Sequence, residues 1–281
     1  MAIAELRESV IFLRKTPLLW ISGLVGGFFA ALTWMMLYIY GSFFTSRLIL
    51  VFALIVLFVT TGTLSLIKDN GGTISTMIAG GKKYYFRVLL PQLVITFAIL
   101  LVSVVCLITF TLLGQATDIG MLTVLAIGIM IPSLILTFFF DTAAVFEERR
   151  VFESIQRSII LVSNQMMEVV SFFVICIVIS IGVIFSLMIV WEAFLFDKLQ
   201  PIMEFTDAQR EAFTPDQLVS MIGPDGMWIT AVIIFFGFLL LLPLLYCYKG
   251  FFFKKLTRNG GLVIQQQTTG EYDNKGRWYK Y

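Results

Sequence analysis

Asp141 is the residue in this sequence best placed to do chemistry inside a membrane. It lies near the end of a long apolar run, five residues before Phe146, so a helix would hold it about 7 Å below the membrane surface. A carboxylate at that depth is costly and commonly marks a proton or ion pathway. The sequence nevertheless favours a structural role, an ion pair with Arg149, Arg150 or Arg157 that pins the following segment, because no second buried acid is evident to complete a relay.

Basic residues gather on either side of this apolar run. Interfacial basic clusters can bind anionic lipid headgroups. The simpler explanation is a solvated turn in which Glu147 and Glu148 form local ion pairs, each contributing little. The candidate headgroup contacts are Arg149, Arg150, Arg157, Lys82 and Lys83.

Several kinds of catalysis lack their usual residues. Histidine is absent from the sequence, which removes the commonest general base and metal ligand. Cys106, Cys176 and Cys247 are each isolated in an apolar stretch, which is typical of packing residues rather than of disulfides or metal sites. The acids of residues 197–226 do not have the spacing of a calcium loop. The sequence therefore predicts no metal site, no cofactor and no enzymatic activity.

Composition assigns the chain to the membrane proteins. Hydrophobic residues make up 59% and charged residues 14% of its 281 residues, whereas a soluble domain has about 25% charged residues. The apolar residues form blocks of the ~20 residues that a helix needs to cross a bilayer. The net charge of +2 does not indicate nucleic acid as a partner. We predict an all-α polytopic membrane protein with six transmembrane helices, at residues 18–40, 48–67, 88–113, 119–146, 169–196 and 227–248.

Amphipathic stretches precede successive pairs of spans. Residues 3–15 have one apolar helical face, and residues 68–87 are a weaker case because their glycines argue against one stiff helix. The clearest stretch lies within 141–165, where the apolar face consists of Val151, Phe152, Ile155, Ile159 and Val162. We predict that each stretch is an interfacial elbow helix introducing a hairpin of two spans. The membrane domain, residues 1–250, then divides into units 1–67, 68–146 and 147–250.

Three details of the spans and their connections follow from local signals. Pro132 lies mid-span and predicts a kink in the fourth helix. Residues 114–118 are predicted to form a tight turn. Within the loop 197–226, Thr206 and Thr214 are good N-caps for two short helices, with Pro215 in the first turn of the second.

Lysine and arginine counts predict the orientation. All but three of the 20 basic residues fall on the side of the N-terminus in this topology, the exceptions being Arg47, Lys198 and Arg210. Basic residues favour the cytoplasmic side, so we predict a cell membrane protein with both termini in the cytoplasm and the loop 197–226 outside. Residues 251–281 are predicted to be a basic cytoplasmic tail, which is either disordered or forms a small hairpin around residues 273–276.

Two segments carry a family resemblance. Residues 143–165, AAVFEERRVFESIQRSIILVSNQ, resemble the region of a prokaryotic membrane-domain family in which a polar turn leads into an E-S/A-x-x-R-S elbow, and residues 70–90 resemble its second elbow. That family includes uncharacterised archaeal six-span proteins and is similar to the membrane domain fused to some glycerophosphodiester phosphodiesterases. The chain contains neither the soluble barrel nor the phosphodiesterase residues, so the resemblance implies a membrane module without that hydrolytic activity.

Two functions are consistent with these features. The favoured one is a non-enzymatic membrane scaffold or accessory subunit that contacts lipids or a protein partner on the cytoplasmic side. The alternative is a transporter or channel for a small solute or ion that uses Asp141, since prolines such as Pro132 and Pro243 can break helices near a site. A polar cavity reaching Asp141 would favour transport, and a solidly packed core would favour the scaffold.

Overall fold

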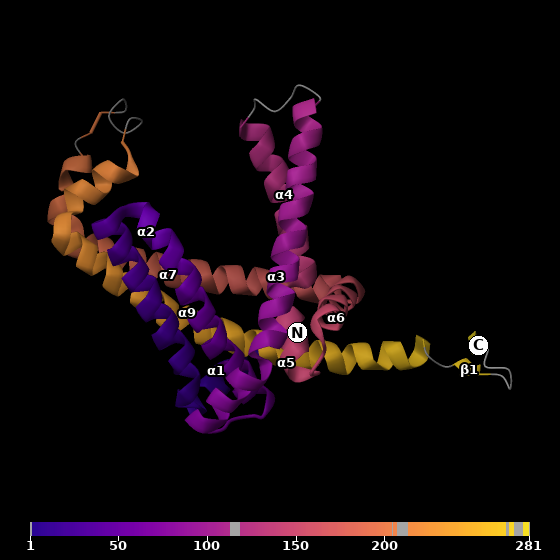
Figure 1. Cartoon of the computed structure of the whole chain (residues 1–281). Helices are drawn as coiled ribbons and strands as arrows, with labels where there is room; N and C mark the ends of the chain where they lie inside the picture. The colour runs from indigo at the N-terminus through magenta and orange to yellow at the C-terminus, as the bar shows by residue number, and fades with distance from the viewer. Residues whose placement is uncertain are drawn as a thin grey trace.

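The computed structural model describes residues 2–112, 119–203, 205–206, 213–267, 270–272 and 278–280. These residues are helical apart from a few connections and one short hairpin near the C-terminus (Figure 1). The helices are α1 (Ala2–Lys15), a 3₁₀ turn (Pro17–Leu19), α2 (Trp20–Lys68), α3 (Ile74–Leu112), α4 (Ile119–Thr137), α5 (Phe140–Phe146), α6 (Val151–Asn164), α7 (Met166–Met203) and α9 (Pro215–Gln267), and the strands are β1 (Gly270–Tyr272) and β2 (Trp278–Lys280).

The fold is that of a multi-pass membrane protein. Among the described residues, five helical stretches are long and apolar enough to cross a bilayer. The first of them contains both of the first two predicted spans. The five stretches are Pro17–Lys68, Ile74–Leu112, Ile127–Phe146, Met166–Ile202 and Gln217–Arg258.

Helix α2 consists of two arms that fold back on each other at Gly41. This residue has φ 71° and ψ −175°, a conformation that favours glycine. The rings of Phe29 and Phe52, one from each arm, lie 4.7 Å apart between centroids, and Figure 1 shows the arms side by side. The turn is therefore sharper than the predicted polar link of residues 41–47.

Close packing of α2 against α9 forms the centre of the bundle. A Cβ atom at Gly27 would lie 2.6 Å from the carbonyl oxygen of Phe235, and one at Gly23 would lie 2.5 Å from that of Leu239. The absence of side chains at these two positions lets the helix backbones approach each other. The glycines of the first span thus serve packing within the chain.

Helix α3 runs without a break through the predicted second elbow and the third span. Gly80 and Gly81 lie inside it, next to Ser65 and Phe58 of α2. In the sequence these glycines argue against one stiff helix. In the structure they lie within α3 and allow it to approach α2 closely. Chain reversal occurs before α3, at Asn70 and the two glycines that follow, all with positive φ.

Helices α1 and α6 have the bounds expected for the first and third elbows. In α6, however, the side that faces the rest of the protein carries the buried Ser154 and Ser158, whereas Phe152 is 73% exposed. The apolar arc identified in the sequence is thus turned partly outward, and the two serines share the internal contacts with the buried Leu161 and Val162.

The C-terminal part of the chain departs from the prediction. Helix α9 continues through the predicted boundary at residue 250, and Phe252, Phe253 and Leu256 are buried in the core, so residues 251–256 are not a free tail. Farther on, β1 pairs antiparallel with β2. A hairpin is present as one alternative predicted, but its first strand is Gly270–Tyr272 and not the preceding residues.

Residue 214 caps α9 as predicted. The backbone N–H of Gln217 donates to the Thr214 hydroxyl, and the backbone N–H of Thr214 donates to the Gln217 side chain, a reciprocal cap. The first short helix predicted in this loop, and the tight turn at 114–118, lie outside the described residues.

Candidate functional site

The fourth predicted span is interrupted just before Asp141. Helix α4 ends at Thr137 and α5 begins at Phe140. The hydroxyl of Ser158, from α6, donates to the carbonyl oxygen of Leu136 (2.8 Å) and accepts from the backbone N–H of Phe139 (3.0 Å). Broken membrane helices are tolerated where such groups satisfy the freed backbone. The interruption therefore depends on α6 and lies six residues beyond Pro132, where the kink was predicted.

Asp141 forms a buried ion pair with Lys249 of α9. The Nζ atom of Lys249 lies 2.7 Å from Oδ1 and 2.8 Å from Oδ2 of the carboxylate. The two residues are 6% and 8% exposed. The expectation that Asp141 pairs with Arg149, Arg150 or Arg157 is wrong, because Lys249 occupies the position next to the carboxylate and those arginines lie beyond the end of α5.

The surroundings of the pair stabilise both charges. The Asp141 Oδ1 atom accepts a hydrogen bond from the backbone N–H of Thr142 (2.7 Å). The Lys249 Nζ atom lies 4.1 Å from the ring centroid of Phe138, within the range of a cation–π interaction. Removing one partner of a buried pair leaves an uncompensated charge, which is strongly destabilising.

A cavity of about 420 Å³ reaches this ion pair, and although most of its lining is apolar we call it the polar cavity because Asp141 and Lys249 line it. Its polar lining comes from Gln92, Thr137, Asp141, Tyr246 and Lys249, and its apolar walls come from α2, α3, α4 and α7. The volume falls within the ~300–1,000 Å³ range of small-molecule sites. Figure 1 shows the α3–α4 hairpin extending away from the α2, α7 and α9 group. The arrangement provides a negative and a positive group facing the same space.

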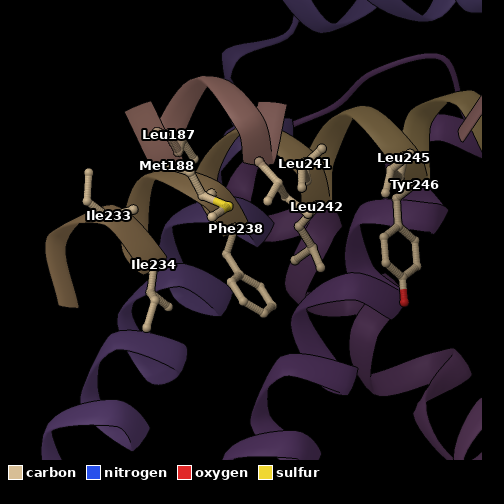
Figure 2. Close-up of a pocket in the computed structure, with 11 residues that line it drawn as sticks. Leu187, Met188, Ile233, Ile234, Phe238, Leu241, Leu242, Leu245 and Tyr246 are labelled. Atoms are coloured by element: carbon tan, nitrogen blue, oxygen red, sulfur yellow. The ribbon is translucent and has the colours of Figure 1, made fainter. Parts of the chain in front are cut away.

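An apolar cavity of about 480 Å³ lies next to the polar one, between α7 and α9. Its walls are Ile184, Leu187 and Met188 of α7 and a row of α9 side chains that ends at Tyr246 (Figure 2). Tyr246 lines both cavities. This side chain is thus a wall that the polar and apolar spaces have in common.

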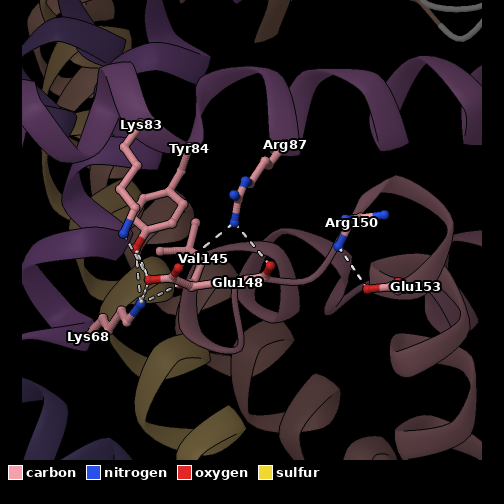
Figure 3. A network of polar contacts seen from close by, with 8 residues as sticks. All are labelled: Lys68, Lys83, Tyr84, Arg87, Val145, Glu148, Arg150 and Glu153. Atoms are coloured by element: carbon pink, nitrogen blue, oxygen red, sulfur yellow. Dashed lines mark hydrogen bonds and ion pairs between the residues drawn. The ribbon is translucent and has the colours of Figure 1, made fainter.

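Glu148 is the centre of a second charged network, between α5 and α6 (Figure 3). Its Oε1 atom accepts from the Tyr84 hydroxyl (2.6 Å) and from the ammonium groups of Lys68 and Lys83 (both 2.9 Å), while Arg87 donates to its backbone oxygen (3.0 Å). These donors, Tyr84 first and then Lys68 and Lys83, hold the pKa of the Glu148 carboxyl well below its usual range. The network ties the turn before α6 to α2 and α3.

The predicted headgroup contacts are only partly available. Arg149 and Arg157 both pair with Glu147, at 3.1 and 2.9 Å, and Lys83 pairs with Glu148. Lys82 and Arg150 are exposed, and neither forms a salt bridge with any residue that the structure describes. Three of the five predicted contacts are thus paired with acids of the same chain, but Glu147 and Glu148 are each shared by several bases, so the cluster keeps a net positive charge.

A third charged group attaches α1 to the bundle. The Nζ atom of Lys255 lies 2.9 Å from Glu168 of α7 and 3.5 Å from Glu5 of α1. Helix α1 therefore packs on α7 and α9 through charges as well as apolar contacts.

Three residues of these sites were missed by sequence reasoning. Lys249 directly follows the sixth predicted span and was not singled out, Glu148 was read as part of a solvated turn, and Ser158 was assigned to neither face of its predicted helix. The one available signal was the presence of opposite charges near the same ends of two spans, Asp141 and Lys249.

Comparisons with known proteins give no relative: no family model, no curated protein and no solved structure matches the chain. The family resemblance of the two elbow segments therefore stays a prediction. Among the residues that the structure describes, no group of three or more acidic or cysteine side chains could hold a metal ion.

Proposed function

We propose that this chain is a membrane transport protein that binds a small solute at the Asp141–Lys249 pair. The observation that carries the proposal is that both charges line one polar cavity beside an interrupted helix. Secondary transporters commonly place their substrate sites at such interruptions. A solidly packed core around Asp141 would have favoured the scaffold role.

The buried ion pair of Asp141 and Lys249 determines which charges a ligand should carry. A ligand with a single charge would displace one partner and leave the other buried and uncompensated, which is costly. A zwitterion can pair its anionic group with Lys249 and its cationic group with Asp141, so that no charge is left unpaired. We therefore propose a zwitterionic ligand, and no chemical conversion of it.

The proposed topology has six crossings. The two arms of α2 count as separate crossings because they fold back at Gly41, and α3, α4–α5, α7 and α9 supply the other four. The distribution of basic residues supports both termini in the cytoplasm of a cell membrane protein. Helices α1 and α6 then lie at the inner surface, and the ion pair lies near that side of the membrane.

Binding by the purified protein tests the proposal. The phosphocholine probe is glycerophosphocholine, a phosphodiester that carries one charge of each sign, whereas choline and inorganic phosphate each carry charge of only one sign. We expect isothermal titration calorimetry in detergent to detect phosphocholine binding and much weaker binding of the other two. Asp141→Asn combined with Lys249→Gln keeps the buried site neutral and should abolish phosphocholine binding. Equal binding of all three compounds, or unchanged binding by the double variant, would contradict the proposal.

An accessory-subunit role is the second candidate, and the α3–α4 hairpin is the feature that favours it. Beyond the buried Ile95, α3 presents Phe97, Leu100 and Val104 outward, and Phe97 is 67% exposed. A membrane partner could cover this face, and the resemblance to membrane domains fused to phosphodiesterases is consistent with such a partner. Under this candidate, Leu100→Trp with Val104→Trp should release the chain from a larger complex in native gels. A chain that migrates as a monomer before and after the change excludes it.

A further inference from the structure

One stripe of α9 changes from apolar to charged along its length. Ile234, Phe238, Leu242 and Tyr246 recur at every fourth residue, and Figure 2 shows all four projecting to the same side of the helix. Lys249 follows three residues later. Residues with these spacings share a helix face. Along this face the side chains are aliphatic or aromatic first, then a phenol, and finally an ammonium group.

The two cavities follow the same order. The apolar cavity extends along α9 as far as Tyr246, and the polar cavity begins at Tyr246 and reaches Lys249 and Asp141. From Ile234 to Tyr246 the helix rises about 18 Å. This length is comparable to half of the ~30 Å hydrocarbon core, which is the depth that one acyl chain occupies.

Resting on the proposed function, we propose that the ligand is a single-chain amphiphile with a zwitterionic headgroup. The headgroup exchanges its two charges with the Asp141–Lys249 pair in the polar cavity. The acyl chain lies in the apolar cavity between α7 and α9, and the glycerol or linker region lies beside Tyr246, whose ring and hydroxyl suit such a boundary. Among the cavities that the described residues line, the apolar one between α7 and α9 shares Tyr246 with the polar one, and its length along α9 suits one chain.

Lysophosphatidylcholine and glycerophosphocholine, the phosphocholine probe used above, share a headgroup and differ in the acyl chain. The full-length protein is reconstituted in nanodiscs of phosphatidylglycerol, whose anionic headgroup does not mimic the zwitterion, and the binding of each compound is titrated against nanodiscs of the same lipid without protein. We expect the lysolipid to bind more tightly than the phosphocholine probe after its partition into the protein-free nanodiscs is subtracted.

Gly237→Phe tests the position of the chain. Gly237 lines the apolar cavity, and a Cβ atom there would be 3.5 Å from Leu187, an ordinary contact. The added ring fills the cavity, so lysolipid binding should weaken by about tenfold or more while phosphocholine binding is unchanged. The control is Gly128→Phe, at an exposed site in α4 where a Cβ atom has no neighbour within 4 Å, which should change neither.

The outcomes separate this inference from the proposed function. If neither compound binds the wild-type protein, the proposed function fails and the inference with it. If phosphocholine binds but the lysolipid binds no more tightly, or if Gly237→Phe leaves lysolipid binding unchanged, the inference alone is overturned. Should Gly237→Phe lose phosphocholine binding as well, Leu187→Gln, which puts an amide into the same cavity, makes the same test.

Discussion

The ammonium group of Lys249 lies 2.7 Å from the carboxylate of Asp141, although 108 residues separate them in the chain. The contact joins the short helix α5 to the last long helix, α9, beside the polar cavity. It holds the two helices together and, under the proposed function, it also presents both charges to a ligand. The two roles can be separated by substitution.

Single and double substitutions of the pair should differ in stability. Asp141→Asn leaves Lys249 as an uncompensated buried cation, and Lys249→Gln leaves the carboxylate alone, so each should cost about 3 kcal/mol. The double variant has no buried charge and should recover much of this loss. Thermal unfolding in detergent measures all three. Costs that simply add in the double variant would show that the two side chains do not interact.

Ser158→Ala should destabilise the interruption between α4 and α5. The hydroxyl satisfies the carbonyl of Leu136 and the N–H of Phe139, and leaving buried groups unpaired costs about 1–3 kcal/mol each. Hydrogen exchange should accelerate around residues 136–142. Ser186→Ala is the control, because that hydroxyl bonds to a carbonyl of its own helix at an exposed position. Similar effects of the two changes would argue against the role of Ser158.

Gly27→Ala should loosen the contact between α2 and α9. The added Cβ would lie 2.6 Å from a backbone carbonyl oxygen, and overpacking of this kind costs about 1–3 kcal/mol. Gly128→Ala, in open space, should be neutral or stabilising by up to about 1 kcal/mol, since alanine favours helix. Melting temperatures that move equally would refute the close approach.

The Glu148 network predicts a dependence of stability on pH. The pKa of this carboxyl is lowered in the folded protein, chiefly by Tyr84. Between that pKa and the unfolded value of about 4.3 the unfolded chain binds a proton that the native protein does not, so stability should fall as the pH drops below about 4.3. Glu148→Gln should flatten this slope, and so should Tyr84→Phe.

Tyr85→Phe is the matched control for the network. Its ring packs near Phe58 and Phe86, and it lies outside the Glu148 contacts. Melting temperatures between pH 3 and pH 6 should show the wild-type slope for Tyr85→Phe. The same slope in Glu148→Gln would mean that Glu148 does not link stability to pH.

Local signals in the sequence predicted most of the helical elements. The mean hydropathy of the long runs predicted a multi-pass helical protein, the amphipathic pattern placed α1 and α6, and Thr214 followed by Pro215 placed the start of α9. Each of these depends on residues within a few turns of one another. The positions of the second elbow and the tail were wrong because Gly80 and Phe252 pack against distant helices, and tertiary contact overrode the local preference.

The candidate site around Asp141 depends on contacts between residues that are far apart in the sequence, and local patterns do not predict such contacts. Asp141 was recognised because a carboxylate inside an apolar run is costly wherever it lies. Its partner was not, because three arginines were nearer in sequence and Lys249 looked like an ordinary interfacial residue. The role of Ser158 also arises from packing, since a serine on a helix face shows nothing of the carbonyl it will meet.

Uptake of phosphocholine into proteoliposomes tests the central claim most directly. Wild-type protein should take up labelled glycerophosphocholine until it equilibrates, and Asp141→Asn with Lys249→Gln, which leaves no buried charge in the cavity, should lower uptake to that of protein-free vesicles. Equal uptake by the two proteins, or none by either, would contradict the account.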